Sequence, residues 1–338
     1  MSLLLAILGF GFLVLVHELG HYFAARWNGV FVEEFAIGMG PTIISKTDKN
    51  GTIWSIKALP IGGMCQMKGE DTGEDDHSSD SFQSKHPARR MSIIFAGPLM
   101  NLIIGFIFFT ILAQNMGFQT NRVAEVIPDM PAAAIGLKAG DEIIEVGGNK
   151  ATTFNDVITF MAIGEGEPTT IKVKRDNVVS DYEITPAVSE TGQFLIGYRP
   201  VIETEPNILQ SFRQGINEAA SMVRQVYLSL KLLITGQVGM DQMGGPVAIL
   251  GLASQVAQTN LLNFVRFIGF LSVNLAVFNL LPFPALDGGW LLILTAELVS
   301  GKKIPEKFMM AWNGAGFAIL MIFMLVITFK DIFFPAAF

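Results

Sequence analysis

The sequence HELGH, at residues 17–21, sets two histidines and a glutamate at a spacing that suits metal chemistry. His17 and His21 are four residues apart, so on a helix both imidazoles project from one face. Two such nitrogens can hold zinc at about 2.0–2.1 Å. Glu18 follows the first histidine, where its carboxylate can take a proton from metal-activated water and pass it to a leaving amine. The pattern predicts a hydrolytic zinc site with Glu18 as the general base.

A catalytic zinc usually takes three protein ligands and keeps one position open. Asp287 is the candidate third ligand, because it directly follows the long uncharged segment that ends in NLLPFPAL. Pro282 and Pro284 should break a helix just before it and leave backbone groups that need partners. A substrate strand is one source of those partners, and Asn279 is a candidate to hold a substrate backbone group. The alternative for Asn279 is that it only caps or packs the broken helix.

The composition places much of this chain in a membrane. Hydrophobic residues make up 51% and charged residues 16%, against about 25% charged in average soluble domains. We predict four transmembrane helices, at residues 1–25, 91–114, 264–286 and 308–330. The last three each have about the 20 residues needed to cross a hydrocarbon core, and the first is an apolar segment that continues directly into HELGH. The first has neither the basic leader nor the cleavage site of a signal peptide. Ionisable groups within a span are costly and usually functional, which strengthens the case for HELGH.

Basic residues gather at one set of span ends and predict the orientation. They are Arg26, Lys85, Arg89, Arg90, Lys302, Lys303 and Lys307. The positive-inside rule then places segments 26–90 and 287–307 in the cytoplasm, and the region 115–260 outside. In this orientation His17 lies about 22 Å and Asp287 about 30 Å along helices that run in the same direction. Both proposed ligands therefore fall toward the cytoplasmic side of the membrane.

Residues 118–189 have a different character from the spans. Short apolar strands alternate with Gly and Asp turns, which predicts a small domain of mainly β structure. Its segment PAAAIGLKAGDEIIEVGG resembles the core of a bacterial-type PDZ domain, an α+β fold. Such domains bind an extended peptide or a C-terminal carboxylate in a groove at a sheet edge. The alternative is a passive filter or spacer. Residues 190–263 are predicted to be a linker, with an amphipathic helix at 205–235 and an imperfect helix at the Gly-Gly-Pro sequence.

The cytoplasmic segment contains an apolar hairpin that is predicted to end at Gly62–Gly63 and to dip into the membrane, where irregular backbone is tolerated inside a protein cavity. The acidic sequence GEDTGEDDHSSD that follows is interpreted as a solvated loop, with a cation site as the alternative. His77 and His86 are interpreted as surface residues. Cys65, the single cysteine, is interpreted as a small buried hydrophobic residue rather than a zinc ligand.

Six motifs in this order and spacing resemble the site-2 protease family of intramembrane zinc metalloproteases, in its bacterial RseP-like group with a PDZ domain. They are HELGH at 17–21, PIGGMCQMKGE at 60–70, AGPLMN at 96–101, the PDZ-like core at 131–148, GGPVAI at 244–249 and NLLPFPALDGG at 279–289. The resemblance covers essentially the whole chain. Some relatives carry two PDZ domains, whereas this chain has room for one.

The resemblance implies zinc held by His17, His21 and Asp287, with Glu18 as the general base. It also implies substrate binding by Asn279 and the loop around Pro282 and Pro284, and by a membrane-dipping hairpin at Gly62, Gly63 and Met64 that pairs with the substrate as an added strand. The usual substrates of the family are single-pass membrane proteins already trimmed by another protease, such as anti-sigma factors or leftover signal peptides. The implied location is the inner or plasma membrane of a bacterial cell.

Two other functions fit parts of the sequence. A non-enzymatic membrane adaptor would use the PDZ-like domain to capture exposed termini, but it leaves the buried ionisable residues unexplained. A metal or proton transporter would use the same ligands, but no inverted repeat is evident. A nucleic-acid partner is not expected, because the net charge is −7 and phosphate binding needs a basic surface.

Overall fold

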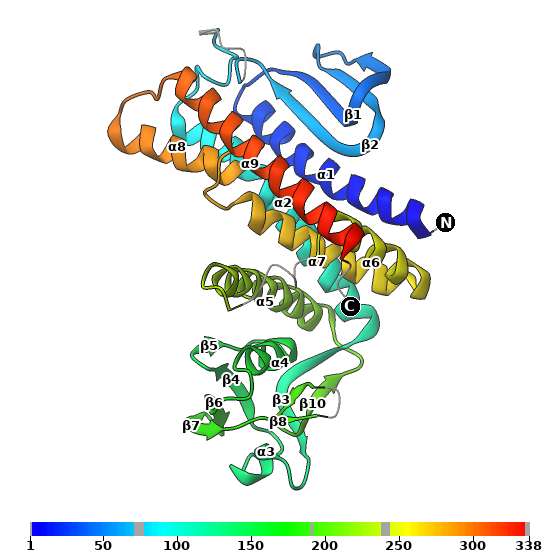
Figure 1. The fold of residues 1–338 in the computed structure, drawn as a ribbon, viewed down its shortest axis with the longest axis vertical. Coiled ribbons are helices and arrows are strands. Elements are labelled where there is room, and N and C mark those ends of the chain that lie inside the picture. Colours follow the sequence, from blue (N-terminus) through cyan, green and yellow to red (C-terminus); the bar gives the residue numbers. More distant parts are fainter. Residues whose placement is uncertain (1, 71–77, 190–191, 238–243, 335–338) are drawn as a thin grey trace. The chain divides into compact units, whose positions relative to one another are not determined.

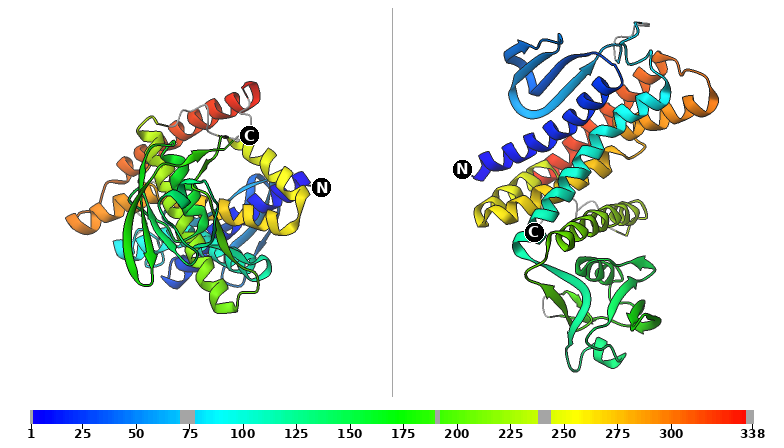
Figure 2. Two further views of the ribbon diagram at one scale, coloured as in Figure 1. Left: turned by 90° about the horizontal axis from the view of Figure 1, so that it is seen from below. Right: turned by 180° about the vertical axis from the view of Figure 1, so that it is seen from behind.

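The computed structural model describes residues 2–70, 78–189, 192–237 and 244–334, and these form two compact units. The first unit takes in the chain up to Gly105 and again from Leu232, and the second comprises Phe106–Lys231. Figure 1 labels the elements, and Figure 2 shows them from two further sides. The acidic loop predicted after residue 69 lies largely outside the described residues, and His77 lies outside them too. His86 is exposed.

Four helices within the described residues are long and apolar enough to cross a membrane. They are α1 (Ser2–Trp27), α2 (Pro87–Met116), α7 (Leu261–Asn279) and residues Lys307–Phe333 of α9 (Glu306–Phe333). The four apolar segments of the sequence thus form helices, as expected for a multi-pass membrane protein. The Gly-Gly-Pro sequence leads into a regular shorter helix, α6 (Pro246–Thr259), which packs against α1, α7 and α9.

The predicted hairpin consists of β1 (Val32–Thr47) and β2 (Ile53–Met67), and β2 packs beside α1 (Figures 1 and 2). The prediction that it ends at Gly62–Gly63 is wrong: the turn lies at residues 48–52, where the Asp48 carboxylate accepts the N–H groups of Asn50 and Thr52. Residues 34–37 pair with 53–56 on one side and with 63–66 on the other. Strands β1 and β2 therefore form a small antiparallel sheet with residues 63–67 along one edge.

Two predicted boundaries around Asp287 differ from the structure. The third span ends at Asn279 rather than 286, because Pro282 and Pro284 cannot continue the helical hydrogen bonding, and residues 280–286 form a tight loop. Segment 287–307, predicted to be a loop, is mostly a helix, α8 (Asp287–Ser300). Its sequence DGGWLLILTAELVS is too short to span a membrane but is rich in helix formers, and it ends at Gly301 in the left-handed conformation that favours glycine.

The second unit is built around an antiparallel sheet in the order β10–β3–β4–β6–β7, with β5 beside β4. Its strands are β3 (Phe118–Val126), β4 (Glu142–Val146), β5 (Asn149–Lys150), β6 (Thr169–Arg175), β7 (Val178–Ile184) and β10 (Tyr198–Glu203). A separate short pair joins β8 (Ala187–Val188) and β9 (Phe194–Leu195). The helices α3 (Pro131–Ala134) and α4 (Phe154–Ile163) connect strands of this sheet, and the buried core lies between α4 and the sheet.

The sheet extends past residue 189, the predicted end of the PDZ-like domain. Strand β10 lies in the segment predicted to be a linker, yet it pairs antiparallel with β3 and forms one edge of the sheet. A six-residue strand without a clear alternation of polar and apolar residues gives little signal in sequence. The amphipathic helix follows as α5 (Ile208–Ile234). Within the second unit it packs on α4, where Arg224 and Ser221 bind the buried carboxylate of Asp156.

Candidate metal centre

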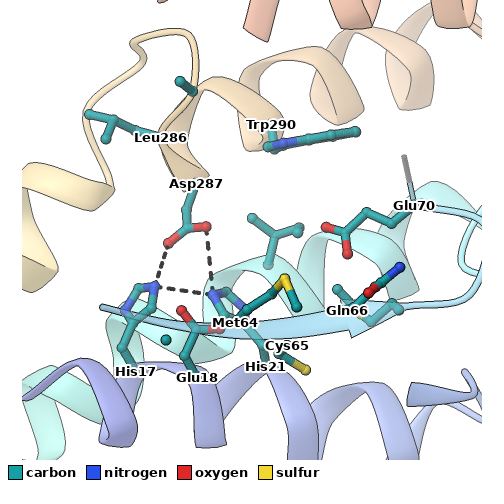
Figure 3. A pocket seen from close by; sticks show the side chains of 14 residues that line it. His17, Glu18, His21, Met64, Cys65, Gln66, Glu70, Leu286, Asp287 and Trp290 are labelled. Carbon is teal, nitrogen blue, oxygen red and sulfur yellow. Dashed lines mark hydrogen bonds and ion pairs between the residues drawn. The ribbon is translucent and has the colours of Figure 1, made fainter. Parts of the chain in front are cut away.

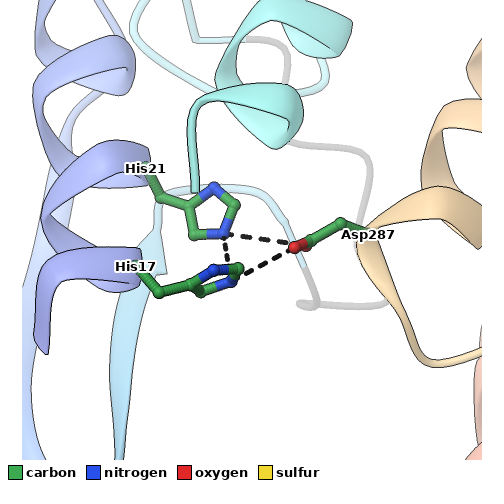
Figure 4. Close-up of side chains that lie close together, drawn as sticks. All are labelled: His17, His21 and Asp287. Atoms are coloured by element: carbon green, nitrogen blue, oxygen red, sulfur yellow. Dashed lines mark hydrogen bonds and ion pairs between the residues drawn. The ribbon is translucent and has the colours of Figure 1, made fainter. Parts of the chain in front are cut away.

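Three side chains from α1 and α8 converge on one point in the first unit (Figure 4). His17 and His21 are buried one helical turn apart, with their Nε2 atoms 3.1 Å from each other. Asp287, the first residue of α8, places one carboxylate oxygen 3.1 Å from Nε2 of His17 and the other 3.6 Å from Nε2 of His21. The structure therefore brings together the three residues predicted to hold a metal.

Helix α2 fixes the far side of each imidazole. Nδ1 of His21 lies 3.0 Å from the main-chain oxygen of Ile93, which can only accept a hydrogen bond, so Nδ1 carries the proton. Nδ1 of His17 lies 3.3 Å from the side-chain amide of the buried Asn101. If that amide is turned so that its oxygen faces the ring, His17 also carries its proton on Nδ1. Both Nε2 atoms then present lone pairs toward Asp287.

This donor set fits zinc. Two imidazole lone pairs and a carboxylate within 4.8 Å of one another repel each other unless a cation lies between them. One carboxylate oxygen of Asp287 is buried and has no hydrogen-bond partner, as expected for an atom aimed at a metal. Two histidines and one carboxylate leave a fourth position free, which is the arrangement of catalytic rather than structural zinc sites.

Glycine lets the two helices approach closely enough for this contact. A Cβ atom on Gly97 of α2 would lie 2.3 Å from Nε2 of His21 and 2.9 Å from Cε1 of His17. One on Gly20 of α1 would lie 2.3 Å from the main-chain oxygen of Ala96. Real Cβ contacts are longer than this, so α1 and α2 can meet at the histidines only where both residues lack side chains.

A cavity of about 500 Å³ opens beside the three converging residues (Figure 3). Glu18 lines it from α1, Leu286 and Trp290 line it from the Asp287 side, and residues 63–67 of β2 form another wall. The edge of the small sheet thus faces the same space as Glu18. A Cβ on Gly63 would lie 3.0 Å from the Glu18 Cγ atom, so a glycine here gives Glu18 its room.

The loop before α8 holds Asp287 rigidly. Ala285 has a φ of 69°, a conformation that costs a non-glycine residue about 1 kcal/mol or more. A Cβ on Gly289 would meet the main-chain oxygen of Phe283 at 2.3 Å, and one on Gly316 of α9 would meet Pro284 at 2.2 Å. The loop is therefore packed tightly from its own helix and from α9, and Asp287 can take few other positions.

Some of the residues predicted to bind substrate line the cavity, and others do not. Gly63 and Met64 line the cavity, whereas Gly62 lies just beyond it and takes a φ of 84° at a bend of β2. Asn279, Pro282 and Pro284 are not among the lining residues, and Pro282 is exposed. Cys65 is buried at the cavity wall.

Asn101, Gly97 and the Ile93 carbonyl are parts of the site that were not predicted from the sequence. Asn101 and Gly97 belong to the motif AGPLMN, which was used only as a mark of resemblance. A polar residue within an apolar span was the available signal, since such residues usually have a specific partner. A main-chain carbonyl leaves no signal in a sequence.

Comparison with known proteins links this arrangement to one family of enzymes. The model of peptidase family M50 matches residues 5–323. A Clostridium perfringens protein with the provisional name zinc metalloprotease CPE1693 is 41% identical over 336 residues, which is 99% of each chain. The regulator of sigma-W protease RasP of Bacillus subtilis is 31% identical over 406 residues, covering 96% of each chain. The zinc metalloprotease RasP of Geobacillus kaustophilus is 30% identical over 414 residues, or 98% of this chain and 97% of that one.

Among solved structures, part of the chain is similar to isolated PDZ domains. The PDZ domain of an SdrC-like protein from Listeria monocytogenes is 27% identical, covers 26% of this chain and 88% of that one, and has a TM-score of 0.22. Its counterpart from Listeria innocua is 28% identical and covers 26% of this chain and 99% of that one, with a TM-score of 0.23.

Proposed function

The chain belongs to peptidase family M50, the site-2 zinc metalloproteases, and from this premise we propose that it hydrolyses peptide bonds in or near the transmembrane segments of single-pass membrane proteins. The observation that carries the proposal is the convergence of His17, His21 and Asp287 beside Glu18, at a cavity one wall of which is a sheet edge. His17, Glu18 and His21 lie on α1, which is long and apolar enough to span a membrane, and Asp287 begins the shorter helix α8.

His17 and His21 would hold the metal through Nε2, and Asp287 would hold it through its carboxylate. Zinc bound there supplies a Lewis acid that activates water and polarises the carbonyl to be attacked. Glu18 would accept a proton from the attacking water and deliver it to the amide nitrogen as the carbon–nitrogen bond breaks. The water oxygen remains on the new carboxyl group, and the amine leaves with the proton, so atoms and charge balance.

The edge of the small sheet positions the substrate. A transmembrane helix hides its amides in hydrogen bonds within itself, so it must unwind before its carbonyl carbon can be attacked. Residues 63–67 pair with β1 on one side, and their other side faces the cavity. A locally unwound segment that adds as a strand along this edge would regain its hydrogen bonds beside Glu18. Substrates with weak helix formers near the cut should therefore react fastest.

We propose that the second unit contributes a peptide-binding or gating surface of PDZ type on the extracytoplasmic side, with the metal centre toward the cytoplasm. Regulated intramembrane proteolysis fits this function, because it acts on membrane proteins that another protease has already trimmed. Anti-sigma factors and remnant signal peptides are the substrate classes we propose. The flanking basic residues support the orientation, and the strand edge at β10 supports peptide binding.

The metal assignment can be tested with the purified protein in detergent. We expect about one zinc per chain in the wild type, as a three-ligand catalytic site holds one ion. Asp287→Asn and His21→Ala should lose most of that zinc and the cleavage of a tagged single-pass substrate. His86→Ala, which alters an exposed histidine, is the control and should keep both. Full zinc content and activity in Asp287→Asn would contradict the proposed ligand set.

A further inference from the structure

Arg90 and Glu297 form a buried ion pair at the end of α8 remote from Asp287. The Arg90 guanidinium donates to the Glu297 carboxylate at 2.8 Å, and each side chain is only 3% exposed. The other Glu297 oxygen accepts the main-chain N–H of Ile304 at 2.9 Å. Its position in the sequence suggested that Arg90 is a surface charge beside a span. Instead, Arg90 is a buried residue paired with Glu297.

The pair joins the two helices that complete the metal centre. Arg90 is in the first turn of α2, the helix whose Ile93 carbonyl and Asn101 amide hold the histidines. Glu297 is ten residues beyond Asp287 on α8, about 15 Å along the helix. Between the pair and the metal position, Ile93 and Leu294 belong to one buried apolar cluster. The contact between α2 and α8 is thus apolar on the metal side and ionic at its far end.

An aromatic contact leads from the pair back to the cavity. The Arg90 guanidinium lies 5.1 Å from the centre of the fully buried Phe82 ring. Phe82 meets Trp290 edge to face at 6.2 Å between ring centres. Trp290 lies three residues after Asp287 and lines the cavity. Arg90 is therefore linked to the C-terminal part of α8 directly, through Glu297, and to its N-terminal part through the rings of Phe82 and Trp290.

A buried ion pair is a poor way to gain stability, because removing two charges from water costs about as much as their attraction returns. Its value lies in fixing geometry, because leaving either charge unpaired is strongly unfavourable. We propose that Arg90 and Glu297 are positioning residues that set α8 against α2 and so hold Asp287 at bonding distance from the histidine-bound metal. The proposal rests on the zinc site proposed above. It predicts an effect on metal binding by residues that never touch the metal.

The test measures zinc affinity by competition with a chromophoric chelator in purified full-length protein. Arg90→Met and Glu297→Gln should each weaken zinc binding by about tenfold or more, the range seen when groups that orient metal ligands are lost. The exchanged pair Arg90→Glu with Glu297→Arg should recover a large part of that loss, and Arg90→Lys should lose less than Arg90→Met. If a single variant does not fold, the exchanged pair and Arg90→Lys still decide the outcome.

The matched control is Asp331→Asn. Asp331 is also a buried carboxylate of the first unit, but it accepts the N–H groups of Gly245 and Ala248 at the start of α6 and is remote in sequence from α2 and α8. The substitution Asp331→Asn should lower thermal stability and leave zinc affinity unchanged. Wild-type zinc affinity in Glu297→Gln, or equal losses in Asp331→Asn, would overturn the proposal.

A second readout needs no metal. In zinc-free protein, amide hydrogen exchange in residues 287–297 should be faster in Glu297→Gln than in the wild type. A wild type that binds no zinc would defeat the proposed zinc site, whereas unchanged exchange in this variant would defeat the tie between α8 and α2.

Discussion

In each of the two histidines, the hydrogen-bond partner of Nδ1 determines whether Nε2 is free to bind a metal. Ile93 settles this for His21, because its carbonyl oxygen can only accept. For His17 the partner is the Asn101 amide, which leaves Nε2 free when it is turned so that its oxygen accepts the Nδ1 proton. The main-chain oxygen of Asn101 accepts the Ser272 hydroxyl at 2.8 Å, which ties Asn101 to α7. The two histidines are thus oriented by different kinds of groups, one of which can be removed by mutation.

Asn101→Ala should therefore weaken zinc binding by about 10- to 100-fold, the usual cost of losing a partner that orients a histidine ligand. Chelator competition on the purified protein measures this loss. Ser272→Ala removes the hydrogen bond to the Asn101 main chain but leaves its side chain in place, so its effect should be much smaller. Equal affinities for wild type and Asn101→Ala would show that His17 needs no such partner.

The sequence predicted which residues converge at the cavity better than it predicted the residues that support them. His17, Glu18, His21 and Asp287 carry recognisable chemistry at recognisable spacing, and they do meet at one cavity. Asn101 looks like any polar residue within a span. Its role beside His17 can be recognised only once α2 is known to cross α1 at Gly20 and Gly97. That crossing is a property of three-dimensional packing, which hydrophobic patterning does not encode.

At the scale of elements, long apolar helices were predictable and short or bent ones were not. The apolar segments stand out because about 20 residues without charge have few alternatives to a spanning helix. The helix α8 and the strand β10 are short, and the sheet of β1 and β2 depends on sharp bends that let one strand pair on both sides. Pairing partners distant in sequence decide such elements, so local patterns do not reveal them.

Asp156 shows how one carboxylate can join two elements of the second unit. It caps α4 through Thr153 and also binds Ser221 and Arg224 of α5. Burial alone would raise the pKa of Asp156, but the hydrogen bonds from Ser221 and Thr152 and the charge of Arg224 outweigh it and hold the pKa below its usual range. Its contribution to stability is therefore complete above the usual carboxyl pKa of about 3.9 and is lost as the pH falls through the lower folded value.

We accordingly expect the thermal unfolding temperature of the full-length protein to fall below about pH 4, and Asp156→Asn to reduce this dependence. At neutral pH the variant should be less stable by about 3 kcal/mol, because Arg224 loses its buried partner. Circular dichroism melts from about pH 7 to about pH 3 measure both effects. Asp129→Asn alters an exposed carboxylate of the same unit and is the control. An unchanged melting curve for Asp156→Asn at every pH would refute this account of the contact between α4 and α5.

At the scale of the whole molecule, family membership decides between the functions that the sequence left open. A member of peptidase family M50 whose predicted catalytic and metal residues are all present is an enzyme, so neither an adaptor nor a transporter is needed to explain the buried ionisable groups. The remaining question at this scale is which side of the membrane each segment faces.

The orientation predicted from flanking charges has a direct test by labelling. In a chain with Cys65→Ser, single cysteines introduced as Lys138→Cys or Lys303→Cys occupy exposed positions of the second unit and of the segment after α8. A membrane-impermeant maleimide should label the first in intact spheroplasts and the second only after lysis, since the positive-inside rule places 287–307 in the cytoplasm. The reverse pattern would invert the proposed topology.

The most direct test of the central claim compares the wild type with Glu18→Gln for zinc content and for cleavage, both measured on the same purified samples. The glutamine keeps the size of the side chain and lies beside the ligands without being one, so zinc should stay at the wild-type level. Cleavage within the spanning segment of a single-pass substrate should fall at least about 100-fold, the usual worth of a general base. A variant that keeps its zinc and cuts as fast as the wild type would contradict the role of Glu18 and the mechanism built on it.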